Sequence, residues 1–97
     1  MDTLQVIAEP RRRQILKLIW EEELAASEIA AQFDVTFGAV SQHLGVLRQT
    51  GLVKMRKDGN RRLYVADREA LAPYRTLLEA MWEETLADLA RTIEEGR

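Results

Sequence analysis

The segment Thr36–Gly51, with the sequence TFGAVSQHLGVLRQTG, decides the fold. It predicts a helix over residues 36–50, because Thr36 can cap the free N–H groups of a first turn and Gly51 can end a helix. Val40, Leu44 and Leu47 recur at the spacing of one helical face, so they define the side that is buried.

The opposite side of this helix carries no charge and is centred on Gly38, Gln42, Gly45 and Gln49. Each glycine inside a helix costs about 1 kcal/mol relative to alanine, and an ordinary solvated face gains nothing in return. The pattern therefore predicts a face whose backbone presses close against another surface.

A β-hairpin is predicted next, from Leu52–Lys57 and Arg61–Ala66 joined by Asp58-Gly59-Asn60. The alternation turns four apolar side chains inward, namely Val53, Met55, Leu63 and Val65. The tip carries four bases, Arg56, Lys57, Arg61 and Arg62. A basic tip can simply keep a hairpin soluble, but its place beside the predicted helix favours contact with phosphates.

The rest of the chain is predicted to be helical. Helices are expected over Thr3–Ala8, from Pro10 to about Glu21, from about Ala26 to Phe33, and from Asp67 to about Glu95 with an interruption at Pro73. The fold class is mainly α with a β-hairpin wing: a winged helix-turn-helix of five helices in the order ααααββα. Residues 1–97 are expected to form a single domain for DNA binding and dimerisation.

Charge is unevenly distributed along the sequence, although its net value is only −2. Residues 36–62 hold six bases and one acid, whereas residues 67–97 hold eight acids and four bases. Screening limits each charge to roughly 8 Å at physiological salt, so the local sign decides phosphate binding. The middle of the chain is therefore expected to bind DNA, and the acidic end to contact a second copy. Arg11–Arg13 opens a helix whose dipole opposes cations, which predicts a phosphate or an acidic partner there.

Several classes of function are excluded. The sequence has no cysteine, and His43 is its only histidine. No catalytic acid pair, nucleophile or phosphate loop is evident, so we expect no enzyme and no cofactor. No apolar run approaches the ~20 residues of a membrane span, and no signal peptide is evident, so a cytoplasmic protein is expected.

Three motifs in order resemble the ArsR-type (arsenic-repressor-like) family. Val6–Leu16 resembles its A-L-A-D-P-x-R-R-x-I-L opening, Ala39–Val53 its A-V-S-x-H-L-x-V-L-R-x-x-G-L-V segment, and Gly59–Tyr64 its G-R-x-x-Y wing. The resemblance implies homodimers held by the first and last helices. It also implies repression, with helix 36–50 in the major groove of a palindromic operator and wing 54–64 on the backbone or minor groove.

The family's metal sensors place two cysteines in an L-C-V-C-D-L run, where this chain has Leu24–Ile29 without cysteine. A second family site uses histidine on the last helix, and residues 67–97 contain none. Metal sensing by either route is therefore not expected. Met81–Leu86 resembles the W-E-E-x-L of metal-free members, and the signal that relieves repression, an effector if there is one, is open.

Phe37, Gly38 and Gly45 depart from the family's frequent Gln, Pro and Lys, so an uncommon operator is expected. Phe37 could contact thymine methyl groups, but its helical phase favours packing at the edge of the core. Gln42 is expected to bind adenine, and Ser41 and Thr36 to bind phosphate or cap the helix. His43 is expected to be half-buried, in packing or in phosphate contact.

The predicted DNA-binding residues are Thr36, Phe37, Gly38, Ser41, Gln42, His43, Gly45, Arg48, Lys54, Arg56, Lys57, Arg61 and Arg62. The predicted dimer interface comprises Leu4, Ile7, Tyr74, Leu78, Trp82, Leu86, Leu89 and Ile93. The alternative function is a winged helix that binds only proteins, without specific DNA binding.

Overall fold

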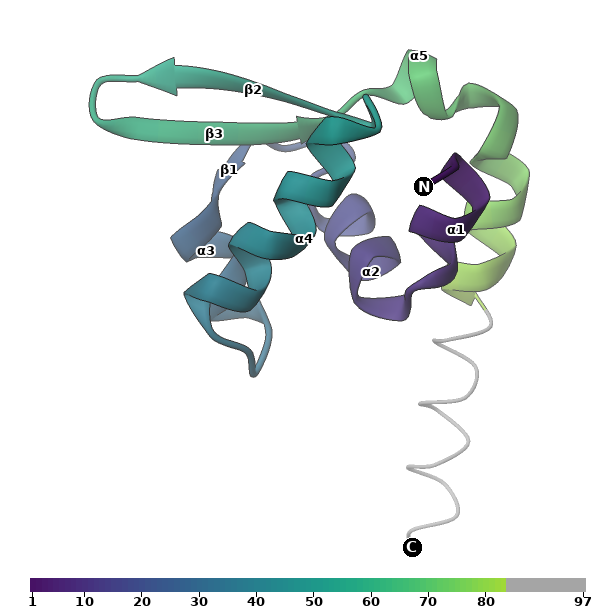
Figure 1. Ribbon diagram of the computed structural model, residues 1–97, viewed down its shortest axis with the longest axis horizontal. Helices are drawn as coiled ribbons and strands as arrows, with labels where there is room; N and C mark the ends of the chain where they lie inside the picture. The colour runs from purple at the N-terminus through teal and green to yellow at the C-terminus, as the bar shows by residue number, and fades with distance from the viewer. Residues whose placement is uncertain (84–97) are drawn as a thin grey trace, which may run out of the picture.

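The computed structural model describes residues 1–83 (Figure 1). Its elements are α1 (Thr3–Ala8), α2 (Pro10–Leu18), β1 (Leu24–Ala25), α3 (Ala26–Gln32), α4 (Phe37–Gln49), β2 (Val53–Asp58), β3 (Arg61–Ala66), α5 (Arg68–Leu71) and the 3₁₀ turn η1 (Ala72–Tyr74). Residues 75–83 are helical. This is the expected winged helix-turn-helix, with the hairpin β2–β3 projecting beside α4.

The core lies where α2, α3 and α4 meet. Val40, Leu44 and Leu47 of α4 are almost fully buried, as their spacing predicts. They share one cluster with Ile15 of α2 and Ile29 of α3. Burying each of these side chains contributes about 1.5–3 kcal/mol, so this cluster fixes the direction of α4.

Both ends of α4 follow the sequence prediction. The Thr36 hydroxyl accepts a hydrogen bond from the backbone N–H of Ala39 at 3.1 Å. At the other end Gly51 has a φ of +75°, which lets the N–H of Leu52 reach the carbonyl of Leu47 at 2.9 Å. The chain therefore turns directly from α4 into the hairpin.

The sheet has three strands in the order β1-β3-β2, not the two of the predicted order. The short strand β1 pairs antiparallel with β3, with Leu24 opposite Tyr64 and Ala25 opposite Leu63. A two-residue strand is too short to show alternation, which is why the sequence did not reveal it. It joins the beginning of α3 to the wing.

The segment after the wing is divided into α5, η1 and the helical residues 75–83. Pro73 lies in η1, between α5 and the helical residues 75–83, so the predicted interruption is present. Trp82 links residues 75–83 to α2. Its indole N–H donates to the backbone carbonyl of Arg13 at 2.9 Å. Its ring packs edge-on against that of Trp20, with 5.5 Å between the ring centroids.

Part of the predicted dimer stripe is buried within the chain itself. Ile7 and Leu78 are 1% and 0% exposed, so both belong to the chain's own core. Leu4 and Leu77 remain 54% and 40% exposed. Leu86, Leu89 and Ile93 lie outside the described residues. None of the described helices is long and apolar enough to cross a membrane.

The side chains of Arg12 and Arg13 serve the fold, and the phosphate or acidic partner expected at Arg11–Arg13 stays a prediction. Arg12 Nε donates to the carbonyl of Val6 at 2.7 Å, and Arg13 donates to that of Ile7 at 2.8 Å. Arg11 lies over the Phe33 ring, 4.9 Å from its centre. The two following arginines therefore satisfy the free carbonyls at the end of α1, where cations are favourable.

Leu78→Ala should lower the free energy of unfolding by about 2–5 kcal/mol, since it opens a cavity in the core. The adjacent Leu77→Ala should change it by less than about 0.5 kcal/mol, because that side chain is exposed. Urea unfolding at low protein concentration measures both. Equal losses would contradict the described placement of residues 75–83.

Candidate nucleic-acid interface

The outer face of α4 is not covered by side chains of other elements within residues 1–83. Gly38, Ser41, Gln42 and Gly45 are all exposed, as predicted. A Cβ added at Gly45 would meet nothing within 4 Å, and one at Gly38 would meet only the Thr36 hydroxyl at 3.9 Å. The fold therefore does not require either glycine. The loss of helix stability that each glycine causes relative to alanine is not offset by a contact within residues 1–83.

His43 joins α4 to the beginning of α2. It is half-buried, and its Nδ1 lies 3.9 Å from a carboxylate oxygen of Glu9. Glu9 also caps α2 by accepting from the N–H of Arg12 at 2.8 Å. Partial burial raises the pKa of Glu9, but the N–H groups of Arg12 and Arg11 and the nearby His43 together hold that pKa below its ordinary value.

Two arginines of the wing form ion pairs with acids from elsewhere in the chain. Arg56 donates to Glu23 at 2.7 Å, which raises the pKa of its guanidinium, and Arg61 forms an ion pair with Glu28. Glu28 also accepts from the N–H of Ala25 at 3.0 Å. Sequence reasoning missed both acids, because each lies 33 residues from its arginine.

The other predicted cations of this surface have no ion pair within residues 1–83; they are Arg48, Lys54, Lys57 and Arg62. All four are exposed. Exposed cations without an acid partner are the groups best able to neutralise phosphates.

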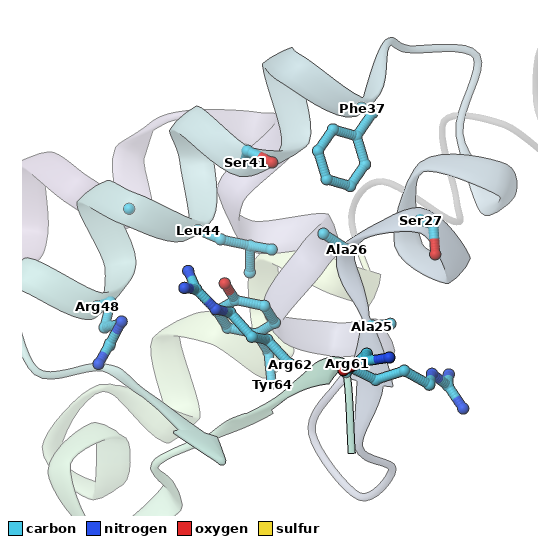
Figure 2. A pocket seen from close by; sticks show the side chains of 12 residues that line it. Ala25, Ala26, Ser27, Phe37, Ser41, Leu44, Arg48, Arg61, Arg62 and Tyr64 are labelled. Atoms are coloured by element: carbon cyan, nitrogen blue, oxygen red, sulfur yellow. The ribbon is translucent and has the colours of Figure 1, made fainter. Parts of the chain in front are cut away.

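A groove of about 650 Å³ runs between α4 and the wing (Figure 2). One wall is the α4 face carrying Ser41, Leu44 and Arg48, and the other is β3 with Arg62 and Tyr64. Ala25–Ser27 also line it. Sequence reasoning missed Ser27, Asn60 and Tyr64 in this lining, since only the three-dimensional fold brings β1 and β3 to α4.

The interpretation of Phe37 as a packed residue is wrong. Its side chain is 58% exposed and lines the same groove as Ser41 and Arg48. The ring lies in the first turn of α4, before the first buried residue of the helix at Val40, and it is not part of the core cluster. Figure 2 shows it projecting from α4 on the side of Ala26 and Ser27.

A bare, uncharged helix face flanked by a cationic wing fits the major groove of duplex DNA, which admits one α-helix. The fold and this surface define a winged helix-turn-helix transcriptional regulator. Residues 9–55 match the model of the bacterial regulatory protein arsR family. The chain belongs to the ArsR family.

The relatives agree with this assignment. The HTH-type transcriptional regulator Rv2034 of Mycobacterium tuberculosis is 39% identical over 90 residues, 93% of this chain and 84% of that protein. A crystal structure of a "possible transcriptional regulator for arsenical resistance" is 40% identical with a TM-score of 0.72, covering 91% of this chain and 96% of that one. The homodimeric winged helix-turn-helix DNA-binding domain of Mb0332 from Mycobacterium bovis is 31% identical with a TM-score of 0.71, covering 82% and 74%.

Among residues 1–83, no group of three His, Cys, Asp or Glu side chains could hold a metal ion. The two cysteine positions of the family's metal motif correspond to Ala25 and Ser27. Ala25 is here part of β1, and Ser27 lines the groove.

Gly45→Ala should raise the free energy of unfolding by about 0.5–1 kcal/mol, because alanine favours the helix and its methyl group has open space. The same change should weaken DNA binding about tenfold, since an added methyl at a close-packed contact costs ~1–3 kcal/mol. Urea unfolding and fluorescence anisotropy with a duplex measure the two effects. Gly51→Ala is the control: it should destabilise the fold, because Gly51 has a φ of +75°. Undiminished DNA affinity of Gly45→Ala would show that the bare face does not meet DNA.

Proposed function

We propose that this protein is a dimeric repressor that binds a palindromic operator with α4 in the major groove and the wing on the backbone or minor groove. The observation that carries this proposal is the combination of a glycine-bearing, uncharged α4 face with adjoining cations that have no acid partner among the described residues. A surface of that kind satisfies both requirements of a DNA reader, close approach and phosphate neutralisation.

Different residues take different roles in this complex. Gln42, in the middle of the exposed face, donates to and accepts from an adenine edge. Arg48, Lys54, Lys57 and Arg62 bind phosphates, and Ser41 adds a hydroxyl to the same strand. Thr36 caps α4 and does so already in the free chain. Arg56 and Arg61 are oriented by Glu23 and Glu28 before DNA arrives.

A second copy is expected to dock at the end of the molecule farthest from the wing. Leu4 and Leu77 leave apolar surface exposed there, and the similar Mb0332 domain is homodimeric, which supports a dimer. Trp82 and Tyr74, two further residues of the predicted interface, are half-buried. Two-fold symmetry then presents two α4 helices to one side of the duplex, which is how such dimers bind half-sites about one helical turn apart.

The alternative, a winged helix that binds only proteins, would have no use for bases without partners along the wing. An apolar or mixed surface serves protein contacts better than this one. We expect the repressor to act without a metal, because the family's cysteine positions are Ala25 and Ser27 here.

Selection of bound duplexes from a random DNA pool tests the proposal. We expect an enriched inverted repeat whose half-site centres lie about 10 bp apart or a small multiple of it. Binding to that duplex should not change when zinc, cadmium or arsenite is added at micromolar concentration. A pool without an inverted repeat would rule out sequence-specific binding by a dimer, and release by one of these metals would overturn metal independence.

A further inference from the structure

We propose that Phe37 is a specificity-determining residue that binds the 5-methyl group of a thymine in each operator half-site. The inference rests on the proposed function, since it concerns how α4 contacts DNA once it lies in the major groove. It assigns a chemical preference to one position of the operator.

The starting observation is an aromatic ring that the fold does not use. Phe37 is 58% exposed, whereas Phe33 four residues earlier packs against the core and lies beneath Arg11. The other exposed large apolar side chains among residues 1–83 are Met1, Leu4 and Leu77. These three belong to the end formed by α1 and residues 75–83, while the beginning of α4 lies beside α3, away from that end (Figure 1). A second copy docked on α1 would therefore not cover Phe37.

Phe37 occupies one of the positions on α4 that reach base edges in such complexes. It is the first residue of α4, directly after the cap at Thr36. In helix-turn-helix complexes the first residues of the recognition helix contact the bases. The next residue is Gly38, so no side chain beside the ring stands between it and an approaching duplex.

The surroundings of the ring combine apolar and polar contacts. Phe37 shares the groove wall with Ser41, Leu44 and Arg48, one face of α4, and faces Ala26 and Ser27 across it (Figure 2). Arg48 has no ion pair within residues 1–83. A DNA strand in this groove would meet Ser41 and Arg48 with its phosphates and leave the apolar ring to the bases.

The chemistry of the base edges then selects thymine. In the major groove adenine, guanine and cytosine present only hydrogen-bond donors and acceptors, and thymine alone presents a methyl group. A phenyl ring offers no conventional donor or acceptor, so it cannot replace water at a polar edge without loss. Against a methyl group it buries apolar surface on both partners.

The experiment removes that methyl group without changing base pairing. Each thymine of the selected half-site is replaced, one at a time, by deoxyuridine, and affinity is measured by anisotropy for the wild type, Phe37→Ala and Gln32→Ala. We expect one position per half-site at which the replacement weakens wild-type binding about fourfold, the value of burying one methyl-sized group. Gln32→Ala, which removes an exposed side chain of α3 that lines neither the groove nor the proposed dimer surface, should keep this sensitivity. Phe37→Ala should bind the thymine and deoxyuridine duplexes equally well.

The outcomes separate this inference from the proposed function. A Phe37→Ala protein that binds the selected duplex more weakly but keeps the wild-type response to deoxyuridine would overturn the methyl contact. Wild-type binding that is unaffected by deoxyuridine at every position would do the same, while leaving specific DNA binding intact. Failure to select any duplex would instead remove the proposed function. Circular dichroism verifies that Phe37→Ala is folded, as expected for a change at an exposed position that leaves the Thr36 cap in place.

Discussion

One buried stripe on α4 holds the functional surface in place. Val40, Leu44 and Leu47 are almost completely covered by α2, α3 and the wing, so α4 cannot rotate about its axis without exposing them. Because the helix repeats every 3.6 residues, fixing this stripe also fixes the opposite face, where Gln42 and Gly45 lie. The hydrophobic contacts of the core thus determine which atoms face outward.

The wing depends on the same arrangement through weaker contacts. It is anchored by the β ladder and by β1, which joins β3 to the beginning of α3. The ion pairs of Arg56 with Glu23 and of Arg61 with Glu28 are exposed, and pairs of this kind contribute only about 0–1 kcal/mol. Their effect is on orientation: they restrict two arginines, while Arg62 and Lys57 have no such pairing within residues 1–83.

Periodicity was sufficient for the helices and the hairpin, because each has a repeated apolar pattern or a residue that begins or ends it. The faces of α4 and the caps at Thr36 and Gly51 followed from those rules. The strand β1 could not be predicted in this way, because a strand of two residues is too short to show a repeated pattern. Phe37 lies in the first turn of α4, beyond the core that its helical phase would face, so the phase argument misjudged it. The backbone carbonyls bound by Arg12 and Arg13 could not be predicted from the sequence either, because these contacts depend on how α1 packs against α2.

The central claim is that α4 recognises bases while the wing holds the backbone, and matched substitutions on the two elements test it most directly. Affinities of Gln42→Ala and Arg62→Ala would be measured on the selected duplex and on a scrambled duplex across a range of salt concentrations. Gln42→Ala should lose about 1–3 kcal/mol on the selected duplex alone, with an unchanged salt slope. Arg62→Ala should lose affinity for both duplexes and reduce the salt slope by about one unit. Equal losses on the two duplexes for Gln42→Ala, or a wild-type salt slope for Arg62→Ala, would contradict this division of labour.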